Sequence, residues 1–253
     1  MSAIAPINIY TYVDKRTDFI EWQLASLQKF CRNDFTYIVF NNGSNGALRD
    51  AINKECKRLN VQVVDIAEKN HDDPSGSHSQ AIQWSWDNVI TKSDKDKIII
   101  DFDIFLFAPV NLLTLLDDGL IEGIPQTRQH VKYLWAGVLI LSKDLPNKET
   151  INFRAGVVGG VNTDVGGNLH TYFLNNPDVT IKALKHTSHL GKHNLNLLPP
   201  TIAENYKKEF CWEIIEGTML HYGRGTNWNN MSDDHHEAKW RLTMDFLDLK
   251  WGN

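Results

Sequence analysis

The sequence predicts an α/β protein with a mostly parallel central sheet, helices on both faces of that sheet and a small antiparallel excursion. Strand and helix patterns alternate along the N-terminal part of the chain, which is the order that builds a parallel sheet. Within the run Lys97 to Leu106, apolar and β-branched residues lead up to two aspartates set one residue apart, as in a buried strand that ends in a carboxylate pair. The composition, 42% hydrophobic and 23% charged over 253 residues, is that of one folded soluble domain.

Two periodicities predict the N-terminal elements. Alternating β-rich runs indicate strands, and apolar residues at three- and four-residue steps, such as Ile20, Leu24 and Leu27, indicate helices. The expected strands are 7–13, 35–40 and 61–66, and the expected helices are 18–30, 47–59 and one that begins near Ser77. Ligands bind beyond the carboxyl ends of parallel strands, so the loops that follow these strands are the expected rim of a site.

Asp101-Phe102-Asp103 is the strongest candidate for chemistry. Side chains at i and i+2 leave a strand on the same face, so both carboxylates are expected to converge on one cation. Hard oxygen donors at that spacing suit Mg²⁺ or Mn²⁺ bridging a diphosphate. Aspartates also commonly end strands and begin turns, and the tripeptide alone favours that plainer interpretation.

After Pro109 the alternation of strand and helix breaks down, and one further core strand is expected over 132–141. Gly137 lies inside it, and a glycine within a strand often marks a place where a ligand or another backbone comes close. Trp135-Ala136-Gly137 is therefore expected to be pocket wall, with packing at a sheet crossing as an equal alternative.

Two features near the C-terminal part also bear on function. Asp164 precedes a helix expected over 165–174, where capping and the helix dipole are enough to explain a carboxylate. A strand-like run ends at His221 and is followed by a glycine-flanked Arg224, which predicts a hinged, phosphate-facing loop. A terminal helix over 233–249 is expected to dock on the core.

Composition excludes several classes of partner. A net charge of -5 argues against general nucleic-acid binding, which normally requires a basic excess. The three scattered cysteines form no paired framework and favour a reducing compartment. There is no basic-then-apolar leader and no apolar run of membrane-spanning length, so we expect a cytoplasmic protein without a membrane span. The oligomeric state stays open.

Several short motifs together carry a resemblance. In chain order they are Tyr10-Thr11-Tyr12, Asn41-Asn42-Gly43-Ser44, Ser75-Gly76-Ser77-His78, Asp101-Phe102-Asp103, Trp135-Ala136-Gly137, Asp164, and His221 followed by Trp228. With this order and spacing the chain resembles the GT-A class of nucleotide-sugar-dependent glycosyltransferases, and its family 2-like group in particular. The resemblance implies a Rossmann-like sandwich in one domain, with a nucleotide-binding half over 1–109 and an acceptor-side half with a closing segment over 110–253.

The same resemblance implies a metal-dependent transferase that moves a sugar from a UDP- or GDP-sugar to a hydroxyl acceptor, such as a glycan. It makes Asp101, Asp103 and His221 ligands of Mn²⁺ or Mg²⁺, and a histidine nitrogen shifts the preference toward Mn²⁺. Asp164 becomes the base of an inverting enzyme or, in a retaining one, a ligand of sugar hydroxyls.

The residues expected to bind the donor come partly from the resemblance and partly from placement. The family more often has an aspartate where this chain has Asn41. Backbone N–H groups near Ser77 and His78 are expected to face a diphosphate, because the helix there begins on the rim where the acidic strand ends. The full expected set is Thr11, Tyr12, Asn41, Ser77, His78, Asp101, Trp135, Gly137 and Arg224, with Lys185 as a second candidate cation.

Two alternatives remain open on the sequence. A sugar-phosphate nucleotidylyltransferase is similar in fold, but its glycine-rich signature should follow the first strand, where this chain has Tyr12-Val13-Asp14-Lys15-Arg16. A non-catalytic glycan- or nucleotide-binding protein with the same fold would bind without turnover. The joint presence of the two aspartates, His221 and Asp164 favours an enzyme.

Overall fold

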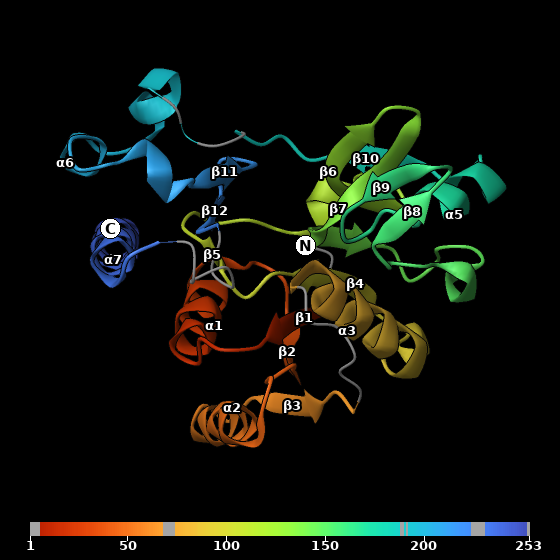
Figure 1. Cartoon of the computed structure of the whole chain (residues 1–253), viewed down its shortest axis with the longest axis horizontal. Coiled ribbons are helices and arrows are strands. Elements are labelled where there is room, and N and C mark those ends of the chain that lie inside the picture. The colour runs from red at the N-terminus through yellow and green to blue at the C-terminus, as the bar shows by residue number, and fades with distance from the viewer. Residues whose placement is uncertain (1–5, 68–73, 188–189, 191, 224–230, 252–253) are drawn as a thin grey trace.

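A computed structural model describes residues 6–67, 74–187, 190, 192–223 and 231–251. Its seven-stranded central sheet is made of β1 (Ile7–Val13), β2 (Phe35–Asn41), β3 (Gln62–Asp65), β4 (Asp96–Ile100), β6 (Ile121–Arg128), β7 (Val131–Leu141) and β10 (Ile181–Ala183). The strand order is β10-β6-β7-β4-β1-β2-β3 (Figure 1). Only the pairings of β7 with β4 and β6 are antiparallel, so the prediction of a mostly parallel sheet is confirmed.

Helices pack on both faces of this sheet, as predicted. They are α1 (Asp18–Phe30), α2 (Gly46–Arg58), α3 (Pro74–Asn88), α4 (Leu113–Leu116), α5 (Leu169–Asn175), α6 (Pro200–Ala203) and α7 (Asp233–Trp251), with short 3₁₀ turns at Ile90–Lys92, Lys148–Thr150, Lys192–Leu197 and Lys208–Phe210. Apolar residues of α1, α2 and α7 join one core cluster, and those of α3 and α5 join the other. Within the described part of the chain, no helix is both long and apolar enough to cross a membrane.

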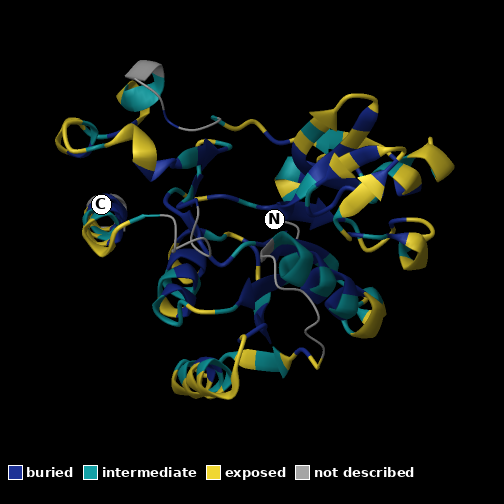
Figure 2. Ribbon diagram, viewed as in Figure 1, coloured by how far each residue is buried: buried dark blue, intermediate teal, exposed yellow. Residues whose placement is uncertain are grey.

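The strand β4 shows why the chain has an unbroken apolar run at its centre. Ile98 and Ile100 belong to the core cluster on the α1 side, whereas Ile99 belongs to the cluster on the α3 side. Successive side chains of a strand point to opposite faces, and here both faces are covered. The middle of the sheet is accordingly dark blue in Figure 2, while the outer faces of the helices carry the exposed residues.

Two small antiparallel sheets form the predicted excursion. β12 (Met219–His221) lies between β5 (Ile104–Leu106) and β11 (Glu213–Ile215), and β8 (Gly156–Val158) pairs with β9 (Val161–Thr163). The first of these sheets brings the C-terminal part of the chain against the segment that directly follows β4. It therefore determines which late residues reach the end of the central sheet.

The structure corrects three boundaries. The buried strand expected to end in the Asp101 and Asp103 pair ends slightly earlier: β4 ends at Ile100, a turn follows in which the Ile104 N–H donates to the Asp101 carbonyl oxygen (3.0 Å), and β5 then begins. The helix expected near Ser77 already begins at Pro74, a residue well suited to a first helical turn.

The third corrected boundary is the start of α5. The helix expected from Val165 begins only at Leu169, because Gly166 adopts a left-handed conformation (φ +88°) and donates its N–H to the Phe153 carbonyl oxygen. A residue with that φ cannot continue a right-handed helix.

The strand β6 was not predicted from the sequence.

Glu122 of β6 predicts a pH dependence of stability. It is 5% exposed, and burial, together with the nearby charge of Glu216, raises its pKa from 4.5 to about 7. The folded protein then holds this proton to a higher pH than the unfolded chain does. The contribution of this protonated carboxyl to the free energy of unfolding is present in full below about pH 4.5 and is lost as the pH rises through about 7.

We expect Glu122→Gln to remove this decline. The unfolding free energy of the variant minus that of the unsubstituted protein should increase by on the order of 1 kcal/mol when the pH is raised from 5 to 8. Urea denaturation of both proteins at the two pH values measures the difference. If the two proteins differ by the same unfolding free energy at pH 5 and at pH 8, Glu122 ionises normally and the prediction is wrong.

Candidate functional site

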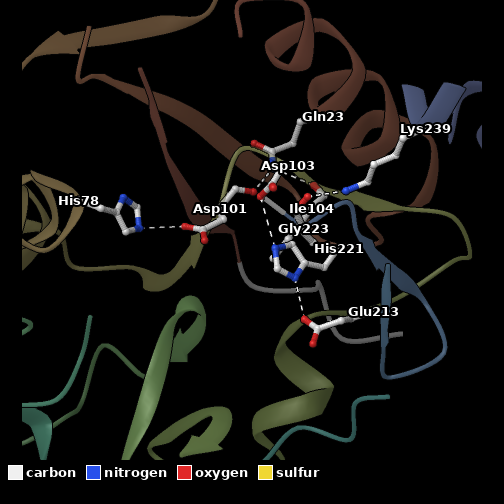
Figure 3. Close-up of polar contacts among 9 residues, drawn as sticks. All are labelled: Gln23, His78, Asp101, Asp103, Ile104, Glu213, His221, Gly223 and Lys239. Atoms are coloured by element: carbon white, nitrogen blue, oxygen red, sulfur yellow. Dashed lines mark hydrogen bonds and ion pairs between the residues drawn. The ribbon is translucent and has the colours of Figure 1, made fainter. Parts of the chain in front are cut away.

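Asp101, Asp103 and His221 meet at the carboxyl end of β4 (Figure 3). Each offers one potential ligand atom, and these three atoms all lie within 4.8 Å of one another. The two aspartates lie in the turn between β4 and β5, so a turn, and not the shared face of a strand, brings the carboxylates together. His221 comes to them because β12 pairs with β5, which places it opposite Ile104.

The backbone of this acidic turn is fixed from two sides. Gln23 of α1 is fully buried and donates from Nε2 to the carbonyl oxygens of Asp101 and Ile104, both at 2.8 Å (Figure 3). The Asp101 N–H donates to the carbonyl oxygen of Gly137 on β7 (2.7 Å). Buried hydrogen bonds of this kind are costly to leave unmade, so they hold the backbone of the turn in this conformation.

Gly137 is required by a neighbouring side chain. A Cβ at this position would lie 2.1 Å from the ring of Trp135, which also contacts the His221 ring with centroids 5.0 Å apart. Both alternatives for this segment are thus represented: Trp135 lines a cavity, and Gly137 makes room for the indole.

We expect Gly137→Ala to displace the indole of Trp135 and to lower the unfolding free energy by about 1–3 kcal/mol, the usual cost of overpacking. Chemical denaturation measures the change. Gly46→Ala is the matched control, because nothing lies within 4 Å of a Cβ placed there. Equal stabilities of the two variants would contradict the steric role of Gly137.

His221 is held between two carboxylates. Its Nδ1 lies 2.8 Å from Oε2 of Glu213, the residue directly opposite it on β11, and its Nε2 lies 3.6 Å from Oδ1 of Asp103. Burial by itself lowers the pKa of His221, but the charges of Asp103 and Glu213 outweigh it and raise the pKa above its ordinary value. Glu213 was not predicted from the sequence, because only the pairing of the short strands β11 and β12 brings it opposite His221.

His78 of α3 contacts the other aspartate. Its Nε2 lies 3.0 Å from Oδ1 of Asp101 (Figure 3). Burial by itself would raise the pKa of Asp101, but the charge of His78 outweighs this and lowers it. Burial likewise lowers the pKa of His78, and Asp101 raises it to above the ordinary value. Ser77 accepts a long hydrogen bond from Asn42 (3.5 Å), so the start of α3 does lie on this rim.

The side chains expected at the nucleotide are mostly engaged inside the protein. The Tyr12 hydroxyl lies 2.6 Å from the Ser85 hydroxyl, and Thr11 is fully buried. Asn41 is also fully buried and donates to the Asp65 carboxylate (2.8 Å). These three residues build the ends of β1 and β2, and direct contact with a nucleotide stays a prediction.

A cavity of about 220 Å³ adjoins His221 of the acidic cluster. It is lined by Ile124, Gln126, Arg128, Tyr133, Trp135, Asp164, His186, Glu213 and His221. Asp164 has 41% of its side chain exposed, accepts from the Val165 N–H (2.8 Å) and lies 3.8 Å from Arg128. The cavity therefore joins His221 of the acidic cluster to the carboxylate of Asp164.

Two expected cations are not placed at this site. Arg224 falls outside the described residues, as does Trp228. Lys185 is exposed, donates its backbone N–H to Glu216 and is not among the residues that line the cavity.

A buried lysine that was not predicted from the sequence holds the backbone that follows His221. Lys239 of α7 is 2% exposed; its Nζ donates to the Gly223 carbonyl oxygen (2.6 Å) and lies 3.9 Å from the ring centroid of Tyr222. The Tyr222 N–H in turn donates to the Asp103 carbonyl oxygen (2.8 Å). The position of Lys239 on the apolar stripe of its helix, three residues before Leu242, was the available sequence signal.

No protein-family model matches the chain, and no curated protein matches it by sequence. Among solved structures, a mannosyltransferase from Pyrobaculum calidifontis in complex with GDP-Man and Mn²⁺ is similar over 72% of this chain and 55% of its own, with a TM-score of 0.48 and 10% identity. The galactosyltransferase LgtC, in complex with donor and acceptor sugar analogues, is similar over 54% of this chain and 58% of its own, with a TM-score of 0.38 and 16% identity. S. aureus TarS 1–349 is similar over 58% of this chain and 50% of its own, with a TM-score of 0.38 and 14% identity.

The chain spans a little over half the length of the solved structures that it matches. Among these structures are a mannosyltransferase and a galactosyltransferase, and glycosyltransferases are the class that the sequence motifs of this chain resemble.

Proposed function

We propose that the chain is a metal-dependent glycosyltransferase that moves a sugar from a nucleoside-diphosphate donor to a hydroxyl of a carbohydrate acceptor. The observation that carries this proposal is the adjacency of two kinds of site. His221 belongs both to the cluster with Asp101 and Asp103 and to the lining of the cavity that contains Asp164. Transfer between two sugars requires such a pair of sites that share a wall.

The donor end has the ligand chemistry for a divalent cation. Two carboxylates and one imidazole, with ligand atoms within 4.8 Å of one another, suit Mn²⁺ and would also accept Mg²⁺. When bound, the cation supplies positive charge against the diphosphate that leaves in the reaction. His78 holds the carboxylate of Asp101 in place from α3, on the side of the site where we place the nucleotide.

The acceptor end supplies a carboxylate and aromatic surface. Asp164 is partly exposed to the cavity, where its carboxylate is available to take the proton of an acceptor hydroxyl. Trp135 lines the same space, is only partly buried and presents ring surface of the kind that packs against sugars, whereas Tyr133 is 2% exposed and closes the wall behind it. We favour inversion, with Asp164 as base; in a retaining enzyme Asp164 would bind sugar hydroxyls instead.

The proposal divides the single domain at about residue 109. Residues 1–109 contribute the aspartates and His78 and would bind the nucleotide, whereas all of the residues that line the cavity come from residues 110–253. The part of the expected closing segment that carries Arg224 lies outside the described residues.

The experiment that tests the proposal is a panel of UDP-, GDP-, dTDP- and CMP-sugars, each with Mn²⁺, Mg²⁺ or EDTA. A ligand that binds only the folded state raises the melting temperature by mass action, even if turnover is slow. We expect one nucleoside-diphosphate sugar to stabilise the protein in a metal-dependent way, with slow release of the free nucleotide. CMP-sugars carry a single phosphate and serve as the contrast.

Two results would overturn the proposal. Binding of a donor without release of nucleotide, in the presence of a range of sugar acceptors, would favour the non-catalytic binding protein. No stabilisation by any donor with either metal would make Asp101 and Asp103 ordinary turn residues.

A further inference from the structure

We infer that Glu213 is a positioning residue that presents Nε2 of His221 to the divalent cation. This inference rests on the proposed function for the identity of the ligand, but its central claim concerns one proton on the His221 ring. The tests below separate the two.

The hydrogen-bond chemistry of the pair assigns the proton. An ionised carboxylate only accepts hydrogen bonds, so the imidazole nitrogen that lies 2.8 Å from Glu213, Nδ1, is the one that carries hydrogen. In the neutral ring the lone pair is then on Nε2, the nitrogen on the side of Asp103. A metal-binding imidazole commonly has its other nitrogen fixed by a carboxylate in this way.

The surroundings of the pair hold this arrangement in place. Glu213 and His221 are directly opposite each other on β11 and β12, and their side chains are only 15% and 12% exposed. Opposite residues of an antiparallel pair project to the same face, and water competes weakly with a hydrogen bond at this depth. The indole of Trp135 lies against the imidazole, with ring centroids 5.0 Å apart, and limits its rotation.

Glu213 acts through His221 and is not itself placed as a ligand. Its Oε2 is bound on the Nδ1 side of the ring, whereas the cation would be bound on the Nε2 side. The group of ligand atoms within 4.8 Å of one another consists of Asp101, Asp103 and His221, and does not include Glu213. Loss of Glu213 should therefore weaken metal binding without removing a ligand.

The first test needs neither metal nor a variant. Nitrogen NMR of the imidazole, at a pH where His221 is neutral, reports which ring nitrogen carries hydrogen. We expect hydrogen on Nδ1 in the metal-free protein. Hydrogen on Nε2 would overturn the inference and would leave the proposed function standing.

The second test measures Mn²⁺ binding directly, by the loss of the free-ion EPR signal on titration. We expect Glu213→Ala to weaken binding by about 10- to 100-fold, the usual cost of removing such a partner. Glu213→Gln keeps the size of the side chain and a carbonyl acceptor, so it should weaken binding less. Glu209→Gln is the control for the change in charge, because Glu209 is an exposed residue of the same segment.

The outcomes separate the inference from the proposed function. If Asp103→Ala abolishes Mn²⁺ binding but both Glu213 variants bind as tightly as the unsubstituted protein, the positioning role is wrong and the metal site remains. If the unsubstituted protein binds no Mn²⁺, the proposed function fails and the presenting role of Glu213 fails with it. Weakened binding in Glu213→Ala, with partial recovery in Glu213→Gln, supports the inference.

Discussion

Asp103→Ala is expected to abolish metal binding and to lower metal-dependent turnover by about 100-fold or more. The carboxylate of Asp103 is 6% exposed and faces Nε2 of His221 at 3.6 Å, so its removal leaves one carboxylate and one imidazole for the cation. Without the cation, no bound positive charge stabilises the negative charge that develops on the leaving diphosphate. Release of nucleotide from the donor found in the sugar panel, with and without Mn²⁺, measures the loss.

The fold should survive this change, because the backbone of the turn is held by groups other than the side chain of Asp103. The Asp103 carbonyl still accepts from Tyr222, and Gln23 still binds the turn at Asp101. Asp245→Asn, an exposed aspartate of α7, is the control for the lost charge. Unchanged metal-dependent turnover in Asp103→Ala, with normal turnover in the control, would remove the central claim of the proposed function.

Asp164→Asn is expected to retain donor and Mn²⁺ binding and to lose turnover by about 10²- to 10⁴-fold, the range that a positioned base contributes. Asparagine keeps the oxygen that accepts from the Val165 N–H but cannot take a proton from an acceptor hydroxyl. Because Asp164 is not one of the grouped metal ligands, its change should leave the metal affinity unaltered. Turnover under saturating donor, beside a Mn²⁺ titration, measures both properties.

The size of the effect distinguishes the two stereochemical alternatives. In a retaining enzyme, where Asp164 would only bind sugar hydroxyls, the variant should mainly raise the KM for the acceptor. Asp178→Asn, at an exposed aspartate after α5, is the matched control. Normal transfer by Asp164→Asn would exclude Asp164 as the base.

The sequence predicted the central layers well because those residues obey a single periodicity. Ile98, Ile99 and Ile100 are buried from both sides, and the stripe of α1 places Ile20 and Leu27 in one core cluster. The burial of these residues follows from the spacing of apolar residues close together in the chain, so the sequence alone predicts it. The strand expected through Asp103 ends at Ile100, and the turn that aspartates commonly begin follows it; the tripeptide allowed both interpretations, because the apolar run continues after the acids.

The parts of the site that were missed depend on contacts between distant segments. Gln23 looks like any polar residue of an amphipathic helix, yet it binds two carbonyls of the acidic turn. Glu213 matters only because β11 pairs with β12 in the register that places it opposite His221. The ring of Tyr12 stacks on Phe40 in the core, with centroids 5.2 Å apart, a contact that the sequence did not reveal. Register and stacking are properties of the assembled sheet.

The pairing of β12 with β5 also has a consequence for how the chain folds. His221 can reach the acidic turn only after a very long loop has closed, and such closure is late and slow compared with the formation of local helices. A cation at this site is therefore expected to contribute little to the early steps of folding. It would instead act on the finished molecule, where it ties two distant segments together and makes the native state open more rarely to a protease.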